Sequence, residues 1–234
     1  MEFNYPPQAD AYRAKVKEFL KANLPAGWKG IGALSRDEAF EFTNNWRKTL
    51  FENGFLAVQW PKEYGGQGLS SLEMVVLTEE FFKAGVPTGG HNDGFGIAML
   101  GNTLLAVGTE AQKKHYLPRI LAGEDLWCQG YSEPAAGSDL GNLGCRAILD
   151  GDEWVINGQK IWTTGGHHAD HIFVLARTSP DDVKHKGITF LLVDMRQKGV
   201  EVRPIRMMSG ESEFNEVFFT DARCPKENVV GEVN

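Results

Sequence analysis

Two short stretches are the most informative part of this chain: Gln129-Gly130-Tyr131-Ser132-Glu133-Pro134-Ala135-Ala136-Gly137-Ser138-Asp139 and Trp162-Thr163-Thr164-Gly165-Gly166. The first is a polar, glycine-rich loop whose backbone N–H groups and hydroxyls suit a polyanion or the edge of a heteroaromatic ring. The second offers an aromatic face followed by two hydroxyl donors. The residues between them predict a hairpin that returns one stretch to the side of the other. Together the two stretches predict a site for a planar, phosphate-bearing cofactor.

Before these stretches, the chain has the patterns of helices. An apolar stripe from Tyr12 to Leu20 has helical spacing and ends at Leu24-Pro25-Ala26-Gly27. Serine and glutamate have capping-box spacing at Ser35/Glu38 and at Ser70/Glu73. Further helices are predicted over Ile97 to Val107, and from Gly108-Thr109-Glu110 to about Leu121, with Gly123 beyond it.

From Asp125 onward the pattern changes to short strands. Asp150-Gly151 and Asn157-Gly158 are turn dipeptides that flank Trp154-Val155-Ile156, and apolar, β-branched runs follow. The predicted strands are 147–149, 154–156, 171–176, 187–193, 200–205 and 216–219. The fold class predicted is α+β, with an all-α domain over residues 1–124 and a small antiparallel β-barrel or sandwich over residues 125–234.

Composition narrows the class of protein. The 31 acidic residues exceed the 24 basic residues, which argues against a nucleic-acid binder. The three cysteines are widely spaced without a Cys-x-x-Cys pair, so a disulfide framework and a structural zinc site are not expected. The N-terminus lacks a secretory signal, and no apolar run approaches the roughly 18 residues of a membrane span. A cytoplasmic protein that does not enter a membrane is predicted.

The chain resembles the flavin-dependent acyl-CoA dehydrogenases in four segments that keep the family's order and spacing and cover almost the whole chain. They are Pro61-Lys62-Glu63-Tyr64-Gly65-Gly66-Gln67-Gly68, the run from Gly108 to Pro118, Ser132-Glu133-Pro134 through Ser138-Asp139, and Asn157-Gly158-Gln159-Lys160-Ile161-Trp162-Thr163-Thr164. The form of Gln129 to Pro134 looks most like bacterial members that act on bulky or unusual acyl groups.

The resemblance implies a helical N-terminal domain, a β-domain and a C-terminal helical bundle. The first two match the periodicity found here, and the third has no counterpart in these residues. In the family the catalytic base is a glutamate that usually lies in the bundle, so the base is expected outside this chain. A truncated dehydrogenase, or one partner of an assembly that supplies the rest, is the expectation.

The resemblance also assigns cofactor-binding residues. Gln129, Tyr131 and Ser132 fall at the segment that holds the pyrimidine edge of FAD, where a donor stabilises the charge that gathers as the flavin accepts a hydride. Ser138 matches the serine that touches both the flavin and the CoA-linked part of the substrate. The segment packed along the flavin near N5 is matched by Trp162, Thr163 and Thr164.

Other candidate residues are given structural roles. Glu133, before a proline, is predicted to fix the loop by hydrogen bonding and not to act as the base. His167, His168 and His171 lack the companions of a metal site, so a solvated loop is predicted and no metal. Gly89 to Phe95 opens a helix that borders the acyl pocket in the family; its glycines either leave room for a wide acyl group or form a flexible loop.

The implied activity is FAD-dependent α,β-dehydrogenation of an acyl-CoA thioester in fatty-acid or lipid metabolism. The expected partners are the acyl-CoA substrate, an electron-transfer flavoprotein as acceptor, and further subunits in a homo- or hetero-oligomer. Two alternatives remain: a related flavin oxidase or monooxygenase, and a non-catalytic subunit of a dehydrogenase assembly.

Overall fold

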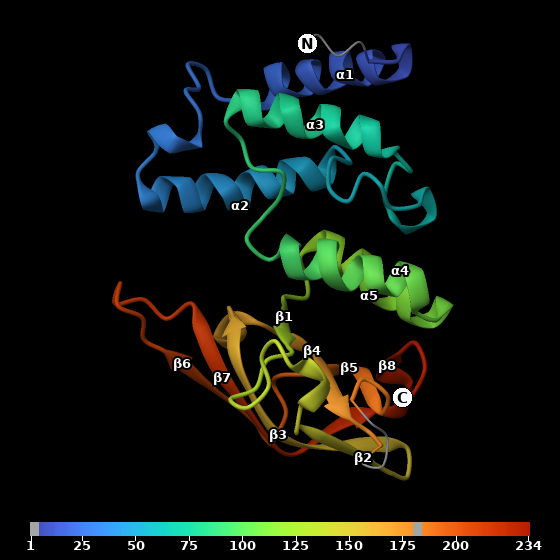
Figure 1. The fold of residues 1–234 in the computed structure, drawn as a ribbon. Helices are drawn as coiled ribbons and strands as arrows, with labels where there is room; N and C mark the ends of the chain where they lie inside the picture. The colour runs from blue at the N-terminus through green and yellow to red at the C-terminus, as the bar shows by residue number, and fades with distance from the viewer. Residues whose placement is uncertain (1–4, 180–183) are drawn as a thin grey trace. The chain divides into compact units, whose positions relative to one another are not determined.

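A computed structural model of the chain describes residues 5–179 and 184–234 (Figure 1). The chain divides into two compact units, one ending at Asp93 and the other spanning Gly94–Asn234. The second unit therefore contains helices as well as the whole sheet. The boundary predicted near Gly123 marks the change from helix to strand, and as a domain boundary it stays a prediction.

The first unit contains the α-helices α1 (Pro7–Asn23), α2 (Arg36–Glu52) and α3 (Ser71–Ala84), with 3-10 turns at Ile31–Ala33 and Lys62–Tyr64. Helix α1 has a proline in its first turn, where the missing N–H costs no hydrogen bond. Its predicted stripe is confirmed, because Tyr12, Val16, Phe19 and Leu20 are all buried. The helix ends where predicted, with the Leu24 N–H donating to the carbonyl of Leu20.

Both predicted capping boxes form. The N–H of Ser35 donates to Glu38 at 2.8 Å, and the N–H of Ser70 donates to Glu73 at 2.9 Å. In each case the serine hydroxyl accepts from the glutamate N–H in return. These reciprocal bonds satisfy N–H groups that a helix leaves without partners at its first turn, so they fix where α2 and α3 begin.

Stacked aromatic rings form the core of the first unit. Phe19 stacks on Phe55 with ring centroids 4.1 Å apart, and Phe81 lies within 6.3 Å of both. Phe81 and Leu77 on α3 are both buried. The three helices are thus held by large apolar side chains that contribute most of their stabilisation through burial.

The second unit begins with helices. Residues Gly94–Gly101 form the π-helix η3, followed by α4 (Asn102–Val107) and α5 (Glu110–Ala122). The prediction of one helix from Ile97 was wrong in its start and type, because the chain already turns at Gly94 with the wider π spacing. Helix α5 is confirmed: Thr109 and Gln112 form a capping box, and Gly123 ends the helix with φ of 73°. Left-handed backbone there favours glycine.

In the part of the chain that the structure describes, eight strands form one mostly antiparallel sheet (Figure 1). The order is β6-β7-β3-β2-β4-β5-β8, and β1 pairs with β4 in parallel. The strands are β1 (Trp127–Gly130), β2 (Arg146–Asp150), β3 (Glu153–Thr164), β4 (His171–Arg177), β5 (Ile188–Asp194), β6 (Val200–Ile205), β7 (Phe214–Pro225) and β8 (Val229–Val230).

Two local predictions were wrong. Residues Trp127–Gly130 form β1, although Gln129 and Gly130 were assigned to a loop. The dipeptide Asn157-Gly158 is not a turn, because β3 continues through it to Thr164. At this point the pairing with β7 shifts register, and Gly158 has φ of 149°. A β-bulge therefore uses the glycine that a turn would also have favoured.

The buried face of the sheet encloses the core of the second unit. Its members include Ile156, Ile172, Val174, Leu191 and Val217, and all three cysteines. Cys128, Cys145 and Cys224 are free thiols, in line with the expected absence of a disulfide framework. Burial raises the pKa of the Cys145 thiol to about 11 and that of Cys224 to about 12, so both stay protonated at neutral pH. Within the described residues, no helix has the length and apolar character to cross a membrane.

An ion pair anchors the entry to β1. Arg119 donates to both carboxylate oxygens of Asp125, at 2.7 and 2.6 Å. Burial raises the pKa of Asp125, but the hydrogen bond and charge of Arg119, together with nearby histidines, outweigh it and leave the pKa below its ordinary value. A carboxylate whose pKa is lower in the folded state stabilises the fold above its unfolded pKa, and this stabilisation is lost as pH falls through the folded pKa.

We therefore expect the melting temperature of the Asp125→Asn variant to fall less steeply than that of the parent as pH is lowered. At pH 7 the variant should melt at a lower temperature than the parent, and the two melting curves should converge as pH is lowered below about 4. Thermal melts from pH 7 to pH 3, followed by circular dichroism, measure this. Parallel curves over the whole range would contradict the role of Asp125.

Candidate cofactor site

The two predicted stretches lie side by side in the second unit. The N–H of Ile161 on β3 donates to the carbonyl of Ser132 at 2.9 Å. Strands β2 and β3 form the expected antiparallel hairpin between the stretches, closed by the turn after Asp150. The hairpin thus brings the second stretch back to the first, as the sequence predicted.

The first loop follows β1, and the carbonyl groups of its first residues accept hydrogen bonds. Ser132 gives its carbonyl to β3, and the carbonyl of Tyr131 accepts from Lys160 Nζ at 3.1 Å. Over the described ranges, the backbone N–H groups of Tyr131 and Ser132 have no acceptor. Burial raises the pKa of Tyr131, whose ring lies edge-on to Phe173. The loop therefore presents backbone donors and a protonated phenol.

Glu133 holds the loop together. It closes a tight turn with Ala136 through two backbone bonds of 2.8 and 3.1 Å. Its carboxylate accepts from the N–H groups of Gly144 and Cys145, at 2.6 and 2.9 Å, and from Lys160 Nζ at 2.7 Å. A carboxylate that accepts from three donors of the protein holds the loop in place, which is the role predicted for Glu133.

The second stretch contains an unusual backbone. Trp162 has φ of 62°, and the side chain is 57% exposed. The register between β3 and β7 shifts between Lys160 and Thr163, which places a bulge at the tryptophan. A tryptophan with left-handed backbone and an exposed indole stabilises the fold little, and such strain is commonest at functional sites.

The two threonines differ in exposure. Thr163 is buried, its carbonyl accepts from Asn215 Nδ2 at 2.9 Å, and its hydroxyl has no partner among the residues that the structure describes. Thr164 is half-buried at the end of β3. The exposed indole and the hydroxyl of Thr164 are therefore more accessible to a ligand than the hydroxyl of Thr163.

The remaining predicted residues lie around this centre. Gln129 is half-buried on β1, with Nε2 3.7 Å from the Met99 sulfur on η3. Ser138 is exposed in the loop that continues from Glu133. The N–H groups of Gly137, Ser138 and Asp139 have no backbone acceptor in the described parts of the chain. The whole loop thus offers a run of backbone donors.

The three histidines lie in two different environments. His167 and His168 lie exposed in the 3-10 turn Gly166–His168, whereas His171 on β4 stacks on Trp127 with centroids 4.8 Å apart. Burial lowers the pKa of His171. No group of three or more histidine, cysteine, aspartate or glutamate side chains in the described residues is arranged to hold a metal ion.

The glycines of the stretch from Gly89 to Phe95 are not equivalent. A Cβ at Gly90 would lie 2.5 Å from the Arg47 side chain, and one at Gly89 would lie 2.7 Å from Asp93. Arg47 and Asp93 form an ion pair of 2.8 Å, so these two glycines allow the backbone to approach that pair. At Gly94 a Cβ would meet nothing within 4 Å. Of the three, only Gly94 leaves open space.

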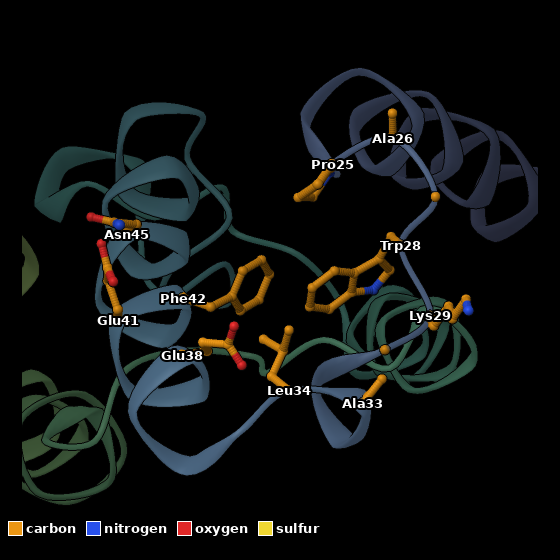
Figure 2. A pocket seen from close by; sticks show the side chains of 12 residues that line it. Pro25, Ala26, Trp28, Lys29, Ala33, Leu34, Glu38, Glu41, Phe42 and Asn45 are labelled. Atoms are coloured by element: carbon orange, nitrogen blue, oxygen red, sulfur yellow. The ribbon is translucent and has the colours of Figure 1, made fainter.

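A depression of about 430 Å³ lies elsewhere, in the first unit (Figure 2). Trp28 and Phe42 stack across it with centroids 4.3 Å apart, and Glu38 and Glu41 project from α2 along its edge. None of the residues of the two predicted stretches lines it. Glu38 is committed to its capping box and the Trp28 indole donates to the Ala84 carbonyl, while the other polar side chains of the lining are Lys29, Glu41 and Asn45.

Backbone donors beside an exposed indole and a half-buried hydroxyl define a site for a planar ligand with acceptor atoms on its edge. The family model for the acyl-CoA dehydrogenase N-terminal domain matches residues 6–124, and that for the middle domain matches residues 128–222. The chain belongs to the acyl-CoA dehydrogenase family.

Individual relatives agree with this assignment. Acyl-CoA dehydrogenase IpdE1 of Mycobacterium tuberculosis is 46% identical over 226 residues, which cover 95% of this chain and 58% of that protein. The ChsE4-ChsE5 complex from Mycobacterium tuberculosis matches with a TM-score of 0.78 at 37% identity, over 100% of this chain and 59% of that chain. The Tcur3481-Tcur3483 steroid ACAD matches with a TM-score of 0.76 at 38% identity, over 100% of this chain and 59% of that one. The chain thus spans less than two thirds of these relatives.

Members of this family are flavoproteins, and the residues present fit a flavin. The acceptor-free N–H groups of Tyr131 and Ser132 suit the oxygen-bearing pyrimidine edge of an isoalloxazine, and the exposed Trp162 suits its flat ring system. The amides from Gly137 to Asp139 suit phosphate or carbonyl oxygens.

Two residues of this region were not singled out from the sequence. Lys160 is fully buried beneath the first loop, and Asn215 on β7 joins Thr163 to His167. Lys160 stands in the quoted Asn157–Thr164 segment, but a lysine in a strand ordinarily faces solvent. The sequence signal that could have pointed to the burial of Lys160 is Glu133 in the first stretch, because a buried lysine needs a carboxylate partner.

Proposed function

We propose that this chain is the FAD-binding part of an acyl-CoA dehydrogenase, which catalyses α,β-dehydrogenation of an acyl-CoA thioester. The observation that carries the proposal is the pair of free amides at Tyr131 and Ser132 beside the exposed Trp162. It occurs on a chain that matches both family models over most of its length.

FAD, when bound, supplies the acceptor for the hydride that leaves the β-carbon of the acyl group. The chain's own residues would bind and orient it. Tyr131 and Ser132 donate to its pyrimidine edge, where negative charge gathers on reduction. Trp162 covers the ring and excludes water, and Thr164 donates near the reacting nitrogen. Gln129, Thr163 and Ser138 complete the proposed site, with Ser138 also facing the CoA-linked part of the substrate.

A wide acyl group is the proposed substrate class. Among the matching structures is a steroid ACAD, so a bulky polycyclic acyl chain is within the range of this family. The open space at Gly94, at the start of η3, is compatible with such a group. The catalytic base is proposed to be a glutamate outside these residues, because Glu133 is committed to the loop.

Assembly with other subunits is also proposed. Matching structures include the ChsE4-ChsE5 complex and one described as an electron transferring flavoprotein of Acidaminococcus fermentans. We place this chain in a homo- or hetero-oligomer that passes electrons to a carrier flavoprotein. The three free, buried cysteines fit the reducing interior of a cell, and a cytoplasmic location is proposed.

Ser132→Ala and Thr164→Val test the site. Each removes one hydroxyl donor, so each is expected to weaken FAD binding by about 1 kcal/mol, or roughly fivefold. Titration with FAD, followed by quenching of flavin fluorescence, measures the affinity. Ser209→Ala and Thr220→Val are matched controls at exposed positions remote in sequence from both stretches, and they should bind as the parent does.

Unchanged affinity in both site variants would remove Ser132 and Thr164 from the site. The activity is tested on this chain joined to the part of the dehydrogenase that supplies the base. When that protein is loaded with FAD and mixed with acyl-CoA without oxygen, bleaching of the flavin's visible absorbance is expected, whereas this chain alone should not bleach it. Rapid peroxide formation in air, without a carrier protein, would instead indicate the oxidase or monooxygenase alternative.

A further inference from the structure

Lys160 on β3 is a charged side chain with no exposed surface, buried under the first loop. Burying an ammonium group is unfavourable unless the charge is paired and its N–H groups find acceptors. Lysines in strands usually extend to solvent along their apolar stems. Its burial here therefore calls for a specific set of partners.

The partners of Lys160 belong to the loop and not to the strand. Nζ donates to Glu133 Oε1 at 2.7 Å and to the carbonyl of Tyr131 at 3.1 Å. The same carboxylate accepts from Gly144 and Cys145, just before β2 begins. One ammonium group thus joins β3, the loop and the residues that lead into β2.

This anchoring determines which way the loop's peptide groups face. The carbonyls of Tyr131 and Ser132 are both turned toward β3, where Lys160 Nζ and the Ile161 N–H bind them. The two N–H groups have no acceptor among residues 5–179 and 184–234. The carbonyl of Tyr131 shares its peptide group with the N–H of Ser132, and a trans peptide group holds the two in opposite directions. The bond from Lys160 therefore fixes the direction of the Ser132 N–H.

We propose that Lys160 is the positioning residue of the flavin loop: by holding the Tyr131 carbonyl and Glu133, it aims the backbone N–H of Ser132 at the cofactor. The inference rests on the proposed function, since it concerns the same site. Lys160 itself does not touch the cofactor.

Lys160→Met tests this, because methionine fills similar volume and removes both hydrogen bonds. We expect FAD affinity to fall at least tenfold and the visible circular dichroism of bound flavin to change, since the Ser132 N–H is no longer held in one direction. The variant should also melt at a lower temperature, because Glu133 loses its counterion. Lys226→Met, which removes an exposed lysine paired with Asp152, is the control and should bind FAD as the parent does.

The double variant Lys160→Met/Glu133→Gln separates positioning from folding. Glutamine keeps an acceptor for Gly144 or Cys145 and removes the unpaired charge, so the melting temperature should largely recover. FAD affinity and the flavin's circular dichroism should not recover, because the Tyr131 carbonyl still lacks its donor. The double variant also carries the test if the single variant does not fold.

The outcomes are distinguishable. Parental affinity and circular dichroism in the double variant, or in a folded Lys160→Met chain, would overturn the positioning role and leave the proposed function standing. Failure of the unaltered chain to bind FAD would overturn the proposed function, and this inference with it.

Discussion

Glu133→Ala is expected to destabilise the chain by about 3–5 kcal/mol, because it leaves Lys160 as an unpaired buried charge. The N–H groups of Gly144 and Cys145 lose their acceptor in the same step. Such a loss is a large fraction of the total stability of a typical domain. Urea unfolding followed by circular dichroism measures it.

Glu201→Ala is the matched control. Glu201 also accepts from a cation, Arg203, but both side chains are exposed, and exposed ion pairs contribute about 0–1 kcal/mol. We expect its unfolding midpoint to lie close to that of the parent. If Glu133→Ala were no more destabilising than this control, the Lys160–Glu133 pair would not anchor the loop.

Trp162→Gly is expected to separate stability from flavin binding. Glycine adopts the observed φ of 62° without strain, which offsets its larger entropy loss on folding, so the free energy of unfolding should stay within about 1 kcal/mol of the parent. FAD affinity should fall by about tenfold, because the aromatic face is gone. Flavin titration and urea unfolding of the same preparation measure the two effects.

Trp162→Ala supplies the comparison. Alanine also removes the indole but keeps the penalty of left-handed backbone, so it should bind FAD as weakly as the glycine variant and be about 1 kcal/mol less stable. A glycine variant with parental FAD affinity would show that the exposed indole does not cover the cofactor. A glycine variant that unfolds far more easily than the parent would show that the indole is needed for folding.

The parts of the fold predicted correctly from the sequence are those whose signals are local. The capping boxes at Ser35 and Ser70 combine a hydroxyl and a carboxylate at fixed spacing, and the helices begin there as predicted. Strand β6 was predicted with its observed bounds, Val200–Ile205. The side-by-side placement of the two stretches followed from the hairpin between them, which the turn at Asp150-Gly151 indicates.

The remaining features depend on contacts distant in sequence. Asn157-Gly158 has the composition of a turn, but pairing with β7 keeps it in an extended strand, and Asn157 bonds the side chain of Asp221. The π-helix at Gly94–Gly101 has apolar residues that fit an α-helix equally well. The Lys160–Glu133 pair joins residues 27 positions apart, and nothing local to either predicts its burial.

The most direct test of the flavin site is amide hydrogen exchange of the chain with and without FAD, which reports where donors become protected. We expect slower exchange in peptides that contain Tyr131 and Ser132, the amides from Gly137 to Asp139, and Trp162 to Thr164. Peptides from Pro25 to Asn45, which line the depression in Figure 2, should exchange at the same rate in both states. Protection confined to Pro25–Asn45, or no protection at saturating FAD, would contradict the assignment of the flavin site.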